Sequence, residues 1–480
     1  MTKKSRRAGA YLATIVMVAA VAAAPYPAAA LNPEIEMMEV GSLATYGIPY
    51  KWAYFRNVGH PCGKNDGASA ANGDLQGTSD AFATFLYLFP SGVPHSQPTP
   101  LYVHSHGGLI GAFSATNSYP GTPHHAYTPG GSGGESRLDQ EHSNQLLFIS
   151  EQTVPEVAGL PILSAGLLAE LRSSGNDFRF LLMSMCDHDA YSGEGAFDEA
   201  ADGFNPYDVD SSGDPIERRA DGLTTSIEAL KFVAAQVGIS HLFLGGTSAG
   251  SIGSLALGFK LESLGLSATG IIADSHVDSL EMEDITAEGC YVFTTAHMNT
   301  IKDKVHGPGL WPGTSADRTA SIGQNQLPNT PVLHIWDQND VGGDACPNPG
   351  GPGGTFGDPG LEQLYANDWH HIRLAQAITA NKGLGNPAHD ASHNVWLCVQ
   401  DPIETERPCA EHSLTKYTVG NSVGHRTIIN PDLPDYAADV AADYGIDYVN
   451  PVDYPSTGDG DYNRWIMDWI QRRIDGVPEP

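Results

Sequence analysis

One predicted strand, sharp turn and helix, built around a serine, constrains the fold of this chain more than any other feature. Residues Gly246-Thr247-Ser248-Ala249-Gly250 fit the pattern G-x-S-x-G, follow the apolar run 241–244, and precede a small, apolar segment at 251–259. A serine at such a turn projects its hydroxyl away from the backbone, within reach of a base and a substrate. Glycines suit the flanking positions because a Cβ there would clash in the crowded turn. A Gly/Ser-rich turn without chemistry has the same local pattern, so the rest of the sequence must decide between the two.

Candidate strands and helices alternate along the chain, which is typical of a mostly parallel sheet covered by helices on both faces. The expected strands are 45–56, 82–89, 101–104, 178–185, 241–244, 268–273, 331–336 and 414–419. The expected helices are 154–172, 217–237 and 462–474. We therefore expect residues 31–480 to form a single α/β domain, with long loop insertions near 277–330 and 342–411.

The first 30 residues have the organisation of a secretory signal peptide. Lysines and arginines cluster in residues 3–7, an uncharged apolar stretch covers 8–24, and Ala28-Ala29-Ala30 is a small-residue cleavage site. A membrane anchor is the alternative, but the stretch is short for a span and the cleavage site argues against it. We expect cleavage after Ala30, export to the periplasm or the exterior, and no stable membrane insertion.

The composition excludes some classes of partner. A formal net charge of −31 repels nucleic acid and anionic membrane surfaces. Six cysteines in an exported chain indicate up to three disulfides, with Cys398 and Cys409 as candidate partners. The acidic segment 208–214 begins like a calcium loop, but Arg219 occupies the twelfth position, where the bidentate acid belongs. We expect no cofactor and no metal in the functional site.

A nucleophilic serine needs a base, and the base needs a carboxylate that orients it. In folds that use this turn, the chain order is serine, acid, histidine, each at the carboxyl end of a strand. Asp340 follows the expected strand 331–336 in a loop from which a carboxylate can turn back towards Ser248. Asp337, nearer the strand, is the alternative acid.

The candidate base is His425. It follows a glycine in the loop after the expected last strand, 414–419, which suits a side chain that reaches over the end of the sheet. His393, within the second expected insertion, and His412, just after it, are the alternatives. A single histidine in a loop is more often only exposed, so the position after the final strand is what favours His425.

Acyl transfer also needs preorganised N–H donors for the oxyanion. One candidate is the backbone N–H of Ala249, the residue after the serine. The other is the N–H of Gly107 or Gly108 in the segment Ser105-His106-Gly107-Gly108, which follows the expected strand 101–104. Glycine at these positions lets the backbone approach a substrate closely. The serine turn, the acid, the histidine and the His-Gly-Gly segment, in this arrangement along the chain, together predict serine-hydrolase chemistry.

From residue 101 onwards, the turn, the His-Gly-Gly segment and the order of Ser, Asp and His resemble the α/β-hydrolase superfamily. Gly246–Gly253, followed by Ile271-Ile272-Ala273-Asp274-Ser275-His276, is similar to the pectin acetylesterase and Notum-type carboxylesterases. Those enzymes have a similar G-x-S-A-G turn, and their next strand ends in Asp-Ser-Gly. Met185-Cys186-Asp187-His188-Asp189 resembles their Tyr-Cys-x-Gly-Asp strand end. The resemblance implies an α/β-hydrolase fold and a serine esterase.

The expected activity is hydrolysis of carboxylic esters through Ser248, His425 and Asp340 with an acyl-enzyme intermediate. Short-chain esters or acyl groups on polysaccharides are the expected substrates. A secreted lipase or polyester depolymerase is the alternative. A non-catalytic binding protein on the same scaffold is a third interpretation, and the presence of all three triad residue types in order counts against it.

Overall fold

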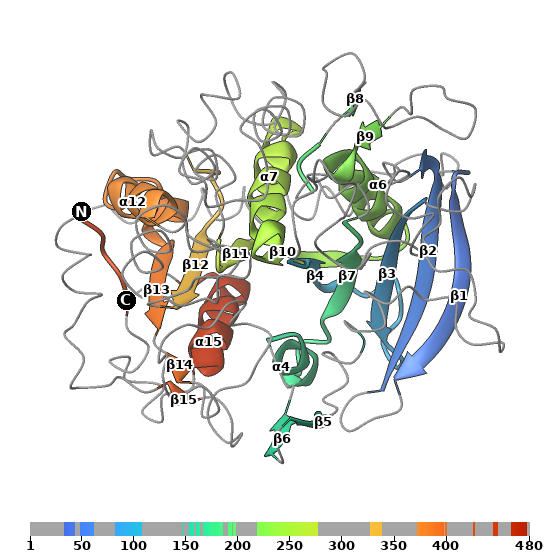
Figure 1. The fold of residues 1–480 in the computed structure, drawn as a ribbon, viewed down its shortest axis with the longest axis horizontal. Coiled ribbons are helices and arrows are strands. Elements are labelled where there is room, and N and C mark those ends of the chain that lie inside the picture. The colour runs from blue at the N-terminus through green and yellow to red at the C-terminus, as the bar shows by residue number, and fades with distance from the viewer. Residues whose placement is uncertain are drawn as a thin grey trace, which may run out of the picture.

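A computed structural model gives a nine-stranded sheet between two layers of helices (Figure 1). It describes residues 33–43, 49–61, 82–107, 146, 153–157, 160–163, 167–185, 191–193, 195–197, 218–276, 327–337, 372–397, 399–400, 426–427, 445–449 and 462–477.

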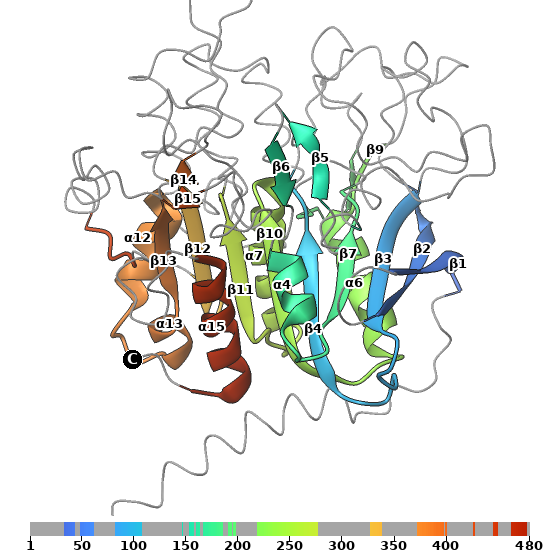
Figure 2. The ribbon, with the colours of Figure 1, turned by 90° about the horizontal axis from the view of Figure 1, so that it is seen from below.

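The sheet has an antiparallel part and a parallel part. The antiparallel pairs β1–β2, β2–β3 and β3–β7 involve β1 (Ile35–Leu43), β2 (Tyr50–Pro61) and β3 (Phe82–Pro90). Every pair after them is parallel, in the order β7 (Arg179–Met183), β4 (Thr99–Ser105), β10 (Ile239–Thr247), β11 (Gly270–Asp274), β12 (Val332–Asp337) and β13 (His393–Leu397). The parallel strands therefore end at one common edge, the upper edge in Figure 2. This confirms the predicted α/β class, and loops at that edge are where such sheets bind ligands.

Helices cover both faces of the sheet. One face carries α6 (Gly222–Ala234), α7 (Ala249–Ser263) and α12 (Ile372–Asn381), and the other carries α4 (Leu167–Ser173) and α15 (Tyr462–Asp475) (Figure 1). The parallel strands are nearly continuous apolar runs because both of their faces are buried; β7, for example, is buried at all five positions. Short elements complete the description: β8 (Gly195–Phe197) pairs with β9 (Arg218–Ala220), and α13 (Pro387–Asp390) precedes β13.

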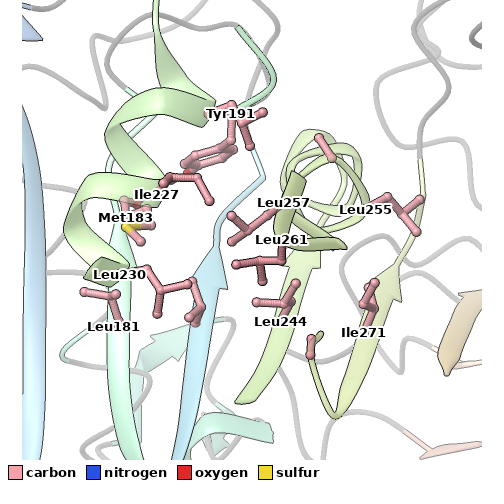
Figure 3. Packing of buried hydrophobic residues seen from close by; sticks show 14 of the residues in the cluster. Leu181, Met183, Tyr191, Ile227, Leu230, Leu244, Leu255, Leu257, Leu261 and Ile271 are labelled. Atoms are coloured by element: carbon pink, nitrogen blue, oxygen red, sulfur yellow. Dashed lines mark hydrogen bonds between the residues drawn. The ribbon is translucent and has the colours of Figure 1, made fainter. Parts of the chain in front are cut away.

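The core under α6 and α7 holds the central strands in register. Leu230 and Leu257, from the two helices, and Leu244, from β10, belong to one buried cluster (Figure 3). On the other face Trp469 of α15 is buried and donates from its indole N–H to Ala391 O at 3.1 Å. Burying each large apolar side chain contributes about 1.5–3 kcal/mol, so the strand ends that carry the site rest on a rigid base.

The helix predicted over 154–172 is wrong in its first part. Strands β5 (Thr153–Val157) and β6 (Leu160–Leu163) pair antiparallel there, and only α4 is helical. Pro155 and Pro161 explain the difference, because a proline inside a helix removes an N–H donor and clashes with the preceding turn.

The range 342–411 is not a loop insertion throughout. It contributes α12, α13 and β13, and β13 forms the edge of the central sheet beside β12. Its sequence, His-Asn-Val-Trp-Leu, has two polar residues followed by three apolar ones, so it shows neither the alternation nor the continuous apolar run that predicts a strand. The predicted last strand, 414–419, lies outside the described residues. The other expected insertion, 277–330, falls in the sequence between β11 and β12, which are neighbours in the sheet.

Several expectations fall on residues that the structure does not describe. These are the leader up to Ala30, all six cysteines and the acidic segment 208–214. Among the described helices, none is long and apolar enough to cross a membrane.

Candidate active site

Ser248 occupies a strained turn between β10 and α7, as the G-x-S-x-G pattern predicts. Its backbone angles are φ 53° and ψ −123°, a combination that L side chains rarely adopt. Such a conformation costs about 1–3 kcal/mol and persists where the surrounding structure holds it in place. Ser248 is the N-cap residue of α7, yet its side chain makes no capping hydrogen bond, and the residue is partly exposed. Its hydroxyl is therefore not used to cap the helix.

The two glycines of the turn are required by close packing. A Cβ at Gly246 would overlap the backbone of Gly250. A Cβ at Gly250 would lie 2.6 Å from His106 O and closer still to Ser105 O. The turn therefore packs directly on the end of β4, and any side chain at either glycine would push the two segments apart.

Backbone hydrogen bonds fix Ser248 on both sides. Its N–H donates to Asp274 O, at the end of β11, over 2.9 Å. Its carbonyl accepts from the N–H of Ser251 at 2.9 Å and from the Ser251 hydroxyl at 2.6 Å. These three bonds account for how the strained conformation is maintained.

Ala249 is where the sequence predicted an oxyanion donor. It is the first residue of α7, and the first four N–H groups of an α-helix have no acceptor within the helix. The positive end of the helix dipole adds to the attraction for an anion there. The first turn of α7 contains no acidic residue that would oppose it.

The His-Gly-Gly segment lies beside the turn, as predicted, but its first N–H groups are already used. Gly107 N–H donates to the Thr247 hydroxyl at 3.0 Å, and His106 N–H donates to the Tyr191 hydroxyl at 3.1 Å. A Cβ at Gly107 would meet Ser248 Cβ at 3.0 Å, which shows how close the two segments are. Of the two predicted glycines, Gly107 therefore borders the nucleophile without a spare N–H. Gly108 lies outside the described residues.

The carboxyl end of β12 lies two strands from β10, a separation of about 10 Å at the usual strand spacing. Asp337 is the last residue of β12, at the edge where Ser248 emerges. Asp340 follows three residues later and lies outside the described residues. Of the two predicted acids, Asp337 is therefore the one that the structure locates, at the end of the strand after β11 in the sheet.

His393 is excluded as the base by its place in the sheet. It begins β13 and pairs with Leu333 near the start of β12, so it lies towards the amino ends of the parallel strands. Ser248 emerges at their carboxyl ends. The imidazole ring of His393 packs edge-on against the buried Trp465 ring, with 5.9 Å between the ring centroids.

A short antiparallel strand pair includes the two residues that directly follow His425 in the sequence. Strand β14 (Val399–Gln400) starts two residues after β13 ends, and it pairs antiparallel with β15 (Arg426–Thr427). In Figure 2 this pair lies beyond the carboxyl ends of β12 and β13. His425 and His412 are themselves outside the described residues, but His425 directly precedes β15.

The carboxylate of Asp274 is buried at the end of β11 and accepts from the hydroxyl of Ser275 at 3.0 Å. Burial, with a further contribution from Asp274, raises the pKa of Tyr102 above its usual range, so this phenol stays neutral. Tyr102 packs under Gly245, where any Cβ would collide with its ring. The end of β10 that leads into the turn is therefore tightly packed against β4.

Sequence reasoning missed four side chains that hold the site: Thr247, Ser251, Tyr191 and His276. Thr247 and Ser251 are neighbours of the motif, so their hydroxyls were visible but their partners were not. Tyr191 comes from a distant loop and has a positive φ of 57°. His276 was noticed only as a departure from glycine; it is buried, and its Nδ1 lies 2.9 Å from the Ser251 hydroxyl.

No protein-family model matches the sequence, and comparison with curated proteins finds no match. Among solved structures, EstA of Aspergillus niger is similar with 12% identity and a TM-score of 0.37, covering 74% of this chain and 70% of that one. An esterase B of Lactobacillus rhamnosis, inhibited by a tributyrin phosphonate, has 11% identity and a TM-score of 0.35 over 99% and 97% of the chains. The cell-wall-degrading esterase LipA of Xanthomonas oryzae has 11% identity and a TM-score of 0.31 over 75% and 90%. Similarities this distant do not establish an activity.

Proposed function

We propose that this protein is an exported serine esterase that hydrolyses carboxylic esters through Ser248, His425 and Asp340. The observation that carries the proposal is the strained backbone of Ser248, held at the start of α7 against the end of β4. A strained serine between a parallel strand and a helix N-terminus is the arrangement that exposes a nucleophile next to oxyanion donors. Strain of this kind is typical of functional sites.

The proposed reaction follows from the roles of these groups. His425 takes the proton of the Ser248 hydroxyl as its oxygen attacks the ester carbonyl carbon. The tetrahedral oxyanion accepts hydrogen bonds from the N–H of Ala249 and from that of Gly108, because Gly107 N–H is engaged by Thr247. The C–O bond to the alcohol then breaks, and His425 returns the proton to the leaving oxygen. Water attacks the acyl-enzyme by the same route and releases the acid.

The β14–β15 pair supports the proposal of His425 as the base. Arg426 pairs with Gln400, just beyond the end of β13, and His425 directly precedes Arg426 in the sequence. His412 lies in the sequence between β14 and β15 and adjoins neither strand. Asp340 orients the imidazole in this proposal, and Asp337, at the end of β12, is the alternative acid.

For the substrate we propose short-chain esters or acyl groups on polysaccharides, on the resemblance of 246–253 and 271–276 to pectin acetylesterases and Notum-type carboxylesterases. The predicted leader implies that the substrate is met in the periplasm or outside the cell. A lipase or polyester depolymerase would use the same site with longer acyl chains, so chain-length preference separates the two.

The test is hydrolysis of nitrophenyl esters from acetate to palmitate by the wild type and by Ser248→Ala. We expect rates that peak at acetate or butyrate and a fall in kcat of about 10⁴-fold or more in the variant. The unfolding midpoint should not change, because the Ser248 side chain makes no capping bond. Wild-type turnover by Ser248→Ala would overturn the proposal. A peak at long chains would support the lipase alternative. Comparison of His425→Ala with His412→Ala, and of Asp340→Asn with Asp337→Asn, assigns the base and the acid by the larger loss in each pair.

A further inference from the structure

We infer that Ser251 and His276 form a positioning pair that fixes the conformation of Ser248, and that His276 does this with its proton on Nδ1. The inference rests on the proposed role of Ser248 and names residues that the triad does not include. Both side chains are buried, and they come from separate elements, α7 and the segment after β11.

The direction of the hydrogen bonds follows from proton counting. A hydroxyl has one proton, and the Ser251 hydroxyl donates it to Ser248 O at 2.6 Å, since a carbonyl can only accept. The 2.9 Å contact between the Ser251 hydroxyl and His276 Nδ1 must then be donated by the imidazole. His276 therefore carries a proton on Nδ1, in either its neutral or its charged form.

The pair adds a second connection between the nucleophile and β11. The first is the bond from Ser248 N–H to Asp274 O, and the second runs from Ser248 O through Ser251 to His276. Both peptide groups that flank the Ser248 side chain are thus fixed to one short segment. Ser275, within that segment, has a φ of 50° and donates its N–H to Ile335 O at 2.7 Å, so the segment is in turn fixed to β12.

The imidazole of His276 is itself held from the far side. Its ring packs edge-on against that of His334, with centroids 6.1 Å apart. His334 Nδ1 lies 3.2 Å from Asn394 Oδ1, and the Asn394 amide donates to Ala375 O at 3.0 Å and to Asp447 O at 2.9 Å. A continuous series of buried polar side chains therefore extends from Ser248 across β12 to β13 and α12. A buried polar network favours a single geometry when its groups are paired.

Loss of the pair should reduce the rate of acylation more than it reduces binding. Without the Ser251 hydroxyl, Ser248 O keeps only one of its two donors, and the strained residue is free to relax towards ordinary angles. A shift of the nucleophile by about 1 Å costs about 100-fold in rate. We expect Ser251→Ala and His276→Ala to lower kcat by about 10-fold or more, with KM changed by less than about 3-fold.

The test is a double-mutant cycle on short-chain nitrophenyl ester hydrolysis, with Ser251→Ala, His276→Ala and the double variant. Because His276 acts through Ser251, the double variant should be no slower than Ser251→Ala alone. His276→Asn should recover most of the rate, because the asparagine amide nitrogen can donate from the place of Nδ1. If His276 were instead a proton-transferring base, asparagine would not rescue the rate.

Two matched controls separate positioning from general destabilisation. Ser254 lies one turn further along α7, is equally buried, and donates its hydroxyl to Gly250 O at 3.0 Å. His389 is buried and contacts Pro328 O through Nε2 at 3.1 Å, before β12 begins. Ser254→Ala and His389→Asn should keep the wild-type kcat even where they lower the unfolding midpoint.

The outcomes distinguish this inference from the proposed function. If Ser248→Ala is inactive while Ser251→Ala and His276→Ala keep the wild-type kcat, the positioning pair is wrong and the esterase stands. Losses in the Ser251 and His276 variants that add in the double variant, or that the two controls reproduce, also overturn the pair. If Ser248→Ala keeps the wild-type activity, the proposed function fails and the pair fails with it.

Discussion

Gly250→Ala tests whether the spacing between the serine turn and the end of β4 controls catalysis. The new Cβ would lie 2.6 Å from His106 O and nearer still to Ser105 O, both of them backbone atoms. Ordinary contact begins near 3.4 Å. Ordinary contact with His106 O alone requires a shift of about 0.8 Å, and the nearer Ser105 O requires more. The turn and the end of β4 must therefore separate by more than about 0.8 Å, since no side-chain rotation relieves the clash.

A displacement of this size should be costly in rate and moderate in stability. Misplacing reacting groups by about 1 Å costs about 100-fold, so we expect kcat to fall by about 30- to 100-fold. Overpacking a core typically costs about 1–3 kcal/mol in the free energy of unfolding. Alanine in place of a helical glycine recovers up to about 1 kcal/mol of this, because it lowers the backbone entropy that folding must overcome.

The assay is short-chain nitrophenyl ester hydrolysis together with urea unfolding followed by circular dichroism. The matched control is Gly258→Ala, also buried in α7, where the new Cβ meets only the terminal methyl of Ile271 at 2.5 Å. A terminal methyl can move, so this variant should keep the wild-type kcat. Equal activities of Gly250→Ala and the wild type would refute the reasoning, as would equal losses in the two variants.

Two further predictions concern hydrogen bonds, one beside the site and one between β2 and the start of α6. Thr247→Val keeps the side-chain shape but removes the acceptor of the Gly107 N–H. It should lower kcat about 5- to 30-fold, because the Gly107 segment beside Ser248 loses a hydrogen bond that fixes its position; an unchanged kcat would contradict this. The hydrogen bond to Asp221, with the charge of Glu228, raises the pKa of His60. Its stabilisation is therefore complete below about pH 6.5 and is lost as the pH rises through the raised value. The urea midpoint should fall over that range, and His60→Asn should remove this part of the dependence; an identical pH profile for the variant would rule it out.

The sequence was sufficient for the parts of the fold that depend on local pattern. Largely apolar runs such as 178–185 and 331–336 predicted buried parallel strands, and the glycines around Ser248 predicted the turn. It failed where pairing across long distances decides the structure. β13 is polar at two of its five positions, and only its neighbour β12 makes it a strand of the central sheet. The range 153–163 has apolar spacing that fits a helix, but its two prolines disfavour a helix, and the segment forms the antiparallel pair β5–β6.

For the site, residue types in chain order predicted the candidates, but not their partners. Nothing in the sequence indicates that Thr247 accepts the Gly107 N–H, because the two residues are 140 positions apart. The same holds for Tyr191 and His106, and for Ser251 and His276. Which glycine N–H is already engaged, and at which end of the sheet a histidine lies, are questions of three-dimensional pairing. The pairings place His393 towards the amino ends of the parallel strands and engage the Gly107 N–H with Thr247, which is why Gly108 is the proposed second oxyanion donor.

The most direct test of the central claim is covalent labelling with a fluorophosphonate, followed by mass spectrometry of the digested protein. Phosphonates react with an activated serine and form a stable mimic of the tetrahedral intermediate, so the experiment does not require the natural ester. We predict one adduct per chain, on the peptide that contains Ser248, with none in Ser248→Ala. Recovery of that peptide without the adduct, or an adduct at another serine, would contradict the account.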